Sequence, residues 1–225
     1  MSRERDRDVR LAVVTGRHPF DVRGFAELFR SIEGIDAYIQ HMEDFSADPA
    51  GLRDWYDVVL FYNMHTDTPT GEGPWYEAGI KAALERLGQT EQGICVLHHA
   101  ILAFTDWRPW AELVGIQDRG FGFHIGETVQ VQVADGEHPI TEGLQGWEMI
   151  DETYAMADAG QGSHVLLTTD HPKSMHTIAW TREYGKARVF CFQSGHDNQA
   201  WAQTGFRQTL TRGILWAAGR AQPST

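Results

Sequence analysis

The sequence predicts an α/β fold: a mainly parallel β-sheet covered by helices on both faces, with a β-rich extension in the second half of the chain. Two observations support this prediction. Up to about residue 100, short runs that are apolar at consecutive positions alternate with segments that are apolar at helical spacing, which is typical of a parallel sheet buried on both faces. From about residue 115 the pattern changes to short or alternating strands separated by turn residues.

The first half of the chain supplies the parallel strands and their connecting helices. We expect strands over residues 10–15, 37–41, 58–62 and 93–97, and helices over residues 22–31 and 73–87. The run over residues 58–62, Val-Val-Leu-Phe-Tyr, has no polar position, so this strand is predicted to be covered on both faces. The helix over residues 22–31 is indicated by the spacing of Val22, Phe25, Leu28 and Phe29.

The second half supplies the extension and the last covering helix. Residues 128–133 alternate between polar and apolar side chains, as in a half-buried strand. Strand character returns at residues 178–180 and 188–192, and a helix over residues 206–218 would cover the sheet. We find no linker or composition break, so one domain is predicted over residues 9–220, with a loosely ordered N-terminus (1–8) and a tail (221–225).

The charge of the chain limits the classes of partner. Its formal net charge is -12, and its 19 Lys and Arg residues are scattered rather than clustered, so nucleic acid and anionic membranes are not expected partners. The charged N-terminus has no apolar segment behind it, which argues against a signal peptide and favours a cytoplasmic protein. A neutral small molecule fits this composition better. The aromatic-rich loops fit either a ligand pocket or a contact between copies of the chain, so a homo-oligomer stays open.

Histidines follow four of the expected strands. In an open parallel sheet, ligands bind outside the carboxyl ends of the strands, so side chains placed there are expected to share one pocket. The residues at these four ends are His18, then Asn63 and His65, then His98 and His99, and finally His196 and Asp197. For any one of these histidines alone, a purely structural role is the simpler interpretation, and only their coincidence at one edge indicates a site.

Residues 93–100, Gly-Ile-Cys-Val-Leu-His-His-Ala, raise the question of which side chain stands at the active position. A nucleophile elbow needs its reactive residue on a sharp turn between a strand and a helix, with small residues on either side. Cys95 is followed by Val96 and Leu97, which extend the strand. We therefore predict that Cys95 is buried with a raised pKa, and that the turn falls at His98. Cys191 also lies in an apolar run, so neither a disulfide nor a cysteine-based zinc site is expected.

Several short motifs in order resemble the trehalose-utilisation, or ThuA-like, family over nearly the whole chain. They are TGRHPFD, VVLFYNMH, GICVLHHAILAF, HPITEGL, DETY, GKARVFCFQSGHD and GILWAAG. The resemblance implies a flavodoxin-like, class I glutamine amidotransferase-like fold that lacks the catalytic cysteine. It also implies a role in bacterial sugar utilisation, on keto-sugars or keto-glycosides made by partner oxidoreductases.

The resemblance places the family's functional residues on particular positions of this chain. The implied catalytic residues are His65, His98, Glu152 and His196. We assign substrate binding to His18, Asn63, His99, Trp107, Asp151, Asp197 and Trp201. Aromatic rings stack on the C–H faces of sugars, although core packing explains Trp107 and Trp201 equally well. His138 also matches a motif, but a His-Pro turn is better explained as structure.

These residue types suit acid–base chemistry on a keto-sugar. A His or Glu would remove the proton beside the ketone and a second His would protonate the enediolate oxygen, which leads to isomerisation, elimination or hydrolysis. Imidazoles at His65, His98 and His196, together with Glu152, also suit a divalent metal such as zinc. Two other functions stay open: a non-catalytic sugar-binding or interaction module, and a glutamine amidotransferase that uses Cys95, which the elbow argument disfavours.

Overall fold

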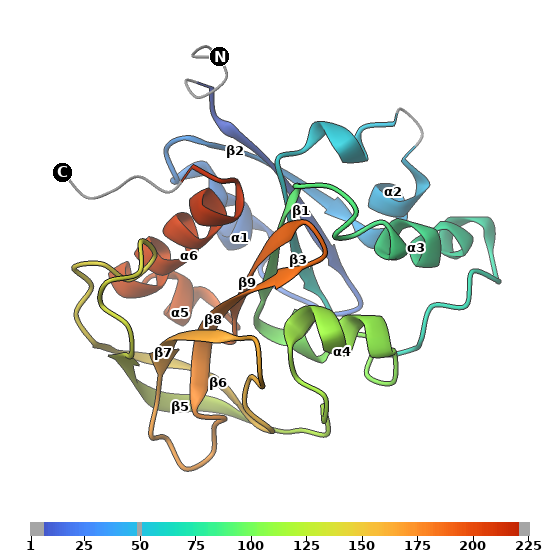
Figure 1. The fold of residues 1–225 in the computed structure, drawn as a ribbon. Coiled ribbons are helices and arrows are strands. Elements are labelled where there is room, and N and C mark those ends of the chain that lie inside the picture. Colours follow the sequence, from blue (N-terminus) through green and yellow to red (C-terminus); the bar gives the residue numbers. More distant parts are fainter. Residues whose placement is uncertain (1–6, 49–50, 221–225) are drawn as a thin grey trace.

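The computed structural model describes residues 7–48 and 51–220; residues 1–6 of the predicted N-terminal segment (1–8) and the predicted tail (221–225) lie outside this part of the chain. Its strands form one nine-stranded sheet in the order β2-β1-β3-β4-β9-β8-β7-β5-β6 (Figure 1). The strands are β1 (Val9–Gly16), β2 (Ile35–His41), β3 (Val58–Asn63), β4 (Gly93–Leu97), β5 (Gly122–Val133), β6 (Trp147–Ala155), β7 (His164–Thr168), β8 (Thr177–Tyr184) and β9 (Ala187–Phe192). The α-helices are α1 (Val22–Arg30), α2 (Met42–Ala47), α3 (Trp75–Glu85), α4 (Arg108–Val114), α5 (Asn198–Trp201) and α6 (Thr204–Ala217).

The sheet is parallel in one half and antiparallel in the other. Strands β2, β1, β3, β4 and β9 pair in parallel, and β8, β7, β5 and β6 continue the sheet in antiparallel pairs. The predicted fold class, a mainly parallel α/β sheet with a β-rich extension in the second half, is therefore confirmed. Strands β6 and β7 and the short helices α2, α4 and α5 were not anticipated element by element.

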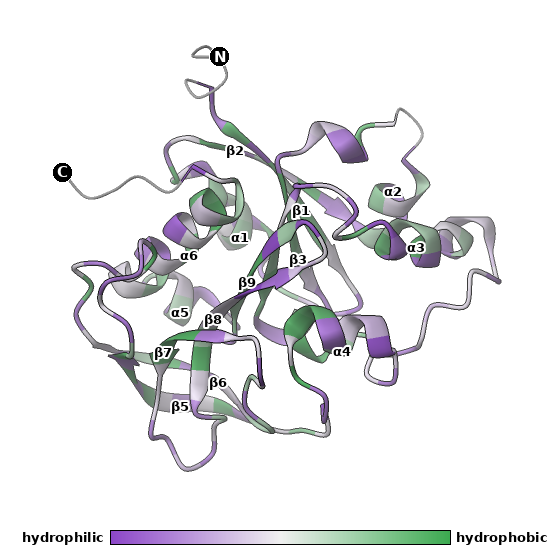
Figure 2. Ribbon diagram, in the orientation of Figure 1, coloured by the Kyte–Doolittle hydropathy of each residue, from purple (hydrophilic) through white to green (hydrophobic). Residues whose placement is uncertain are grey.

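Two apolar layers, one on each face of the sheet, form the core. Helices α1 and α6 cover one face, where Phe25 and Ile214 belong to the same buried apolar cluster as Leu60 of β3 (Figure 1). Helices α2, α3 and α4 cover the other face, where Trp110 of α4 packs against Phe61 of β3. Every residue of β3 is buried, as its uninterrupted apolar run predicts. Figure 2 shows the covering helices in mixed colours, which fits helices with one apolar and one polar side.

Among the described helices, none combines the length and the apolar character needed to cross a membrane.

An ion-pair cluster at the amino end of the sheet gives a first prediction. Asp57 accepts hydrogen bonds from Nη1 and Nη2 of Arg7, each at 2.7 Å, and from the backbone N–H of Arg10 at 2.9 Å. Burial acts to raise the pKa of Asp57, but the hydrogen bonds from Arg7 and Arg10 outweigh it and hold this pKa well below its ordinary value. Because the pKa is lower in the folded state, the stabilisation is present at neutral pH and is lost as the pH falls below about 4.

Asp57→Ala is expected to lower the free energy of unfolding by about 3 kcal/mol at pH 7, since it leaves the partly buried Arg7 and Arg10 without their carboxylate. Urea denaturation from pH 7 to pH 3 should show the difference from wild type shrinking in acid. Asp54→Ala is the control, because Asp54 pairs with Arg86 at an exposed site and should cost under about 1 kcal/mol. Equal losses in the two variants would contradict the role given to Asp57.

Candidate active site

The histidines at the strand ends lie along the carboxyl edge of the parallel half of the sheet. Gly16 of β1 pairs with Asn63 of β3, so the residues that follow these strands begin at the same level. His98 directly follows β4, and His196 lies four residues beyond β9. Strand β6 of the antiparallel extension brings Glu152 to the same place, where its carboxylate contacts His98.

His98 occupies the turn, as predicted, and Cys95 lies in the core. His98 has a φ of 52°, in the left-handed region that side chains with a Cβ rarely adopt, and it starts a 3₁₀ turn over His98–Leu102. Cys95 pairs with Phe190 in the middle of β4 and is 1% exposed. Burial raises the pKa of the Cys95 thiol well above its ordinary value, so it is a poor nucleophile at neutral pH.

His98, Glu152 and Tyr154 form a buried triangle of polar atoms. Nε2 of His98 is 3.1 Å from Oε2 of Glu152 and 2.7 Å from Oη of Tyr154, and this Oη is 2.8 Å from the same Oε2. Nδ1 of His98 lies 2.7 Å from the backbone carbonyl oxygen of Gln193, which can only accept, so Nδ1 carries a hydrogen. In the neutral imidazole, Nε2 is then an unprotonated acceptor that faces a carboxylate.

The proton count of this triangle requires one more positive charge. The hydroxyl of Tyr154 has a single hydrogen, which can be donated to Nε2 of His98 or to Oε2 of Glu152 but not to both. Two acceptors held 3.1 Å apart without a hydrogen between them repel each other. The geometry is therefore satisfied by one further proton shared between Nε2 and Oε2 or by a bound cation.

The acid–base properties of the triangle fit this description. Burial acts to raise the pKa of Glu152, but the hydrogen bonds from His98 and Tyr154 outweigh it, and the pKa falls below its ordinary value. Burial and the nearby carboxylate of Glu152 raise the pKa of Tyr154 well above its ordinary value. Glu152 is therefore a carboxylate at neutral pH, and Tyr154 keeps its hydrogen.

Asp151 holds the loop that carries His196. Its carboxylate is buried and accepts hydrogen bonds from the backbone N–H groups of Glu152 at 2.9 Å, Gly195 at 2.8 Å and His196 at 3.0 Å. Burial raises the pKa of Asp151, against the effect of these bonds. Asp151 was predicted to bind substrate, but all three partners are backbone groups of the site, so the structure gives it a positioning role.

His196 completes a set of three metal-binding side chains. Its ring centroid is 5.3 Å from that of His98, and its side chain is 20% exposed, so it lies on the open side of the cluster. One donor atom from each of His98, Glu152 and His196 lies within 4.8 Å of the other two. Asp197, predicted to bind substrate, instead caps α5 by accepting from the backbone N–H of Gln199 at 2.8 Å.

His18 and His99 extend the cluster from its other side. The ring of His18 stacks on that of His99 at 4.2 Å between centroids and meets the edge of His196 at 5.8 Å. Burial, followed by the nearby His98 and His196, lowers the pKa of His18. His99 is 1% exposed and lies against both His18 and Tyr62, where burial lowers its pKa well below the ordinary value. His18 is therefore the more accessible of these two neutral imidazoles.

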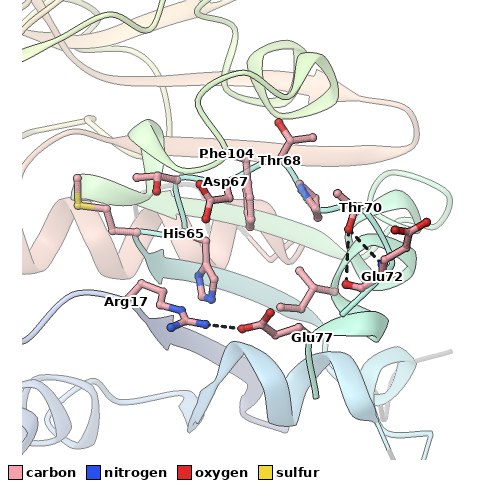
Figure 3. A pocket seen from close by; sticks show the side chains of 13 residues that line it. Arg17, His65, Asp67, Thr68, Thr70, Glu72, Glu77 and Phe104 are labelled. Atoms are coloured by element: carbon pink, nitrogen blue, oxygen red, sulfur yellow. Dashed lines mark hydrogen bonds and ion pairs between the residues drawn. The ribbon is translucent and has the colours of Figure 1, made fainter. Parts of the chain in front are cut away.

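His65 lies apart from this set, in a neighbouring cavity of about 580 Å³ (Figure 3). The cavity is lined by polar side chains, including Arg17, Asp67 and Glu77, together with Phe104. Burial, with smaller effects of Arg17 and His41, lowers the pKa of His65 to about 4. Of the four side chains expected to suit a metal, His98, Glu152 and His196 therefore lie together, and His65 lies apart from them.

Residues that are adjacent in the sequence face two different regions at this edge of the sheet, either the cavity or the histidine cluster. Arg17 has a φ of 61° and lines the cavity, where it pairs with Glu77 at 2.6 Å, while His18 faces the histidine cluster. Asn63, predicted to bind substrate, is fully buried, and its Nδ2 lies 3.2 Å from Nδ1 of His65. It orients His65 rather than facing the open side.

Both tryptophans assigned to substrate binding are buried. Trp107 is 9% exposed and contacts Phe104, and Trp201 is 2% exposed and donates its indole N–H to the carbonyl of Gly195 at 2.8 Å. These positions favour core packing for Trp107 and support of the His196 loop for Trp201. Sequence reasoning assigned no role to Tyr154, although its place two residues after Glu152 on a strand puts both side chains on one face.

The sequence matches the model of one protein family, and the structure is similar to solved structures that share its fold. The family model of ThuA, described as trehalose utilisation, matches residues 19–217. A ThuA-like protein from Parabacteroides merdae aligns with a TM-score of 0.76 at 20% identity, over 97% of this chain and 93% of that one. A cytoplasmic protein from Salmonella typhimurium aligns with a TM-score of 0.65 at 10% identity, over 92% and 98%. A glutamine amidotransferase from Thermotoga maritima aligns with a TM-score of 0.50 at 12% identity, over 82% and 75%. No curated protein matches the sequence.

Proposed function

The chain belongs to the ThuA trehalose-utilisation family, and from this premise we propose that it converts a keto-sugar or keto-glycoside by proton transfer beside the ketone. Membership of the family supports the general role of the protein in sugar utilisation. The observation that supports the proposed reaction is the buried triangle of His98, Glu152 and Tyr154. It combines a hydroxyl donor with a place for positive charge.

Enolisation of a ketone needs two things from a protein. Negative charge develops on the carbonyl oxygen, and a preorganised donor or cation placed there stabilises it in a site that excludes water. The hydroxyl of Tyr154, and a positive charge held between Nε2 of His98 and Oε2 of Glu152, supply this stabilisation. The carbon-bound proton needs a base, and His18 and His196 are the imidazoles on the open side of the triangle. Protonation of the former carbonyl carbon of the enediolate gives the isomerised ketone. Alternatively, the enediolate expels the glycosidic oxygen from the carbon two positions away from the carbonyl carbon, which is an elimination.

The test is incubation of the purified protein with a panel of 3-keto-glycosides in D₂O, followed by NMR. We expect deuterium on the carbon beside the ketone and a new sugar product, both faster than in a blank without protein. Cys95→Ala should retain full activity, since Cys95 is in the core and takes no part in the reaction.

Two results would overturn the proposal. Sugar binding measured by thermal shift, with neither exchange nor product across the panel, would indicate a non-catalytic binding module. Glutaminase activity that disappears in Cys95→Ala would indicate an amidotransferase. The first of these remains the alternative function, but no contact in the site favours it over catalysis.

A further inference from the structure

We infer that His98, Glu152 and His196 bind one divalent transition-metal ion of the zinc type at the carboxyl edge of the sheet. The inference deepens the proposed function and rests on it for the role of the ion: the positive charge between Nε2 of His98 and Oε2 of Glu152 is then a metal ion. The existence of the ion site itself depends only on the geometry of the three side chains.

The spacing of the donor atoms fits a metal site. Nε2 of His98 and Oε2 of Glu152 are 3.1 Å apart. Two ligands of a tetrahedral zinc ion, with bonds of about 2.0–2.2 Å, lie roughly 3.4 Å apart. The third donor, on His196, lies within 4.8 Å of both, so a small shift of one partly exposed side chain would complete the set. Two histidines and a glutamate form a recurrent ligand set of catalytic zinc, with a position left for substrate or water.

The surroundings orient His98 as a ligand. A metal-binding imidazole usually donates its other ring N–H to a carbonyl or carboxylate, which fixes the lone pair toward the ion. Nδ1 of His98 does this with the backbone carbonyl of Gln193 at 2.7 Å, and this leaves Nε2 directed at Glu152. Each of the three ligands comes from a different part of the fold: the end of β4, strand β6 and the loop after β9.

The local charge also favours a cation. Asp151 and Glu152 are adjacent buried acids, and among the described residues the ion-pair partner of Glu152 is His98. Arg17, the cation that follows β1, is paired with Glu77 in the neighbouring cavity. The donors are imidazole nitrogens and a carboxylate oxygen, a combination that suits zinc and its first-row neighbours better than calcium or magnesium.

An ion in this place changes one assignment of the proposed function. His196 then holds the metal, and His18 is left as the imidazole that carries protons. Nδ1 of His18 has no hydrogen-bond partner among the described residues. The ion would polarise the ketone oxygen, which is the Lewis-acid role of a catalytic metal.

The test begins with the full chain stripped by a chelator and dialysed, then titrated with Zn²⁺ by calorimetry and with Co²⁺ by visible absorption. We expect one ion per chain, and a Co²⁺ spectrum typical of a low-coordinate nitrogen and oxygen site. Glu152→Gln and His196→Ala should each weaken binding by at least about tenfold. His138→Ala is the matched control and should bind as wild type does, because His138 is a half-buried histidine that lies against Trp216, outside the ligand set.

The outcomes separate the ion site from the proposed function. No binding by the stripped wild-type chain, or binding that neither Glu152→Gln nor His196→Ala weakens, overturns the ion site. Full turnover of a keto-glycoside by the stripped chain overturns the catalytic role of the ion and leaves the proposed function standing. Tight binding at these residues without turnover or deuterium exchange supports the ion site and counts against the proposed function.

Discussion

Glu152→Gln is expected to reduce kcat on a keto-glycoside by roughly 10³-fold, with a much smaller change in KM. The substitution keeps the size of the side chain but removes the negative charge that faces Nε2 of His98 at 3.1 Å. Without that charge, a positive charge is no longer held beside the place where the enolate oxygen forms. An interaction realised mainly in the transition state is lost, so kcat falls more than binding does.

The control for this prediction is Glu127→Gln. Glu127 lies on β5, in register with Asp151 of β6, but its carboxylate pairs with Lys173 at 2.7 Å. This variant should retain most of the activity, and both variants should unfold at temperatures within a few degrees of wild type. A Glu152→Gln protein that turns over at the wild-type rate would remove Glu152 from the reaction.

The fold could be predicted where the local pattern and the tertiary structure agree. The apolar runs at residues 58–62 and 93–97 became the buried strands β3 and β4 because strands covered on both faces tolerate few polar side chains. Strand β6 contains Glu148, Asp151 and Glu152, residue types that local propensity disfavours in strands. The latter two are buried there because long-range hydrogen bonds satisfy them, and no local pattern reports such bonds.

The sequence predicts which edge of the sheet carries the histidines, but it does not predict which of them share one pocket. Strand ends in the parallel half placed the histidines together, because parallel strands end at the same edge. Which way each side chain turns depends on the residues after the strand. Arg17 and His98 both adopt positive φ values, so the alternation of a strand no longer holds there. Arg17 and His65 line the neighbouring cavity, while His98 faces Glu152.

Asp151→Ala is expected to lower the free energy of unfolding by about 3 kcal/mol and to reduce kcat as strongly as His196→Ala does. The carboxylate of Asp151 accepts three backbone N–H groups, and its removal leaves buried donors without partners, each at a cost of about 1–3 kcal/mol before the loop relaxes. Urea denaturation and steady-state kinetics measure the two effects. Asp158→Ala is the control, because Asp158 is exposed and accepts one backbone N–H, from Thr177.

The double variant distinguishes positioning from a separate catalytic contribution. Since Asp151 contacts the backbone of Gly195 and His196, its effect on turnover should pass through the imidazole of His196. Once His196 is alanine, loss of Asp151 should change kcat by less than about threefold, while the loss of stability remains. Independent, multiplicative effects on kcat would show that Asp151 acts by another route than His196, either through its hydrogen bond to the backbone N–H of Glu152 or on the substrate itself. The loop after β9 would then be only one of the parts of the active site that Asp151 holds in place.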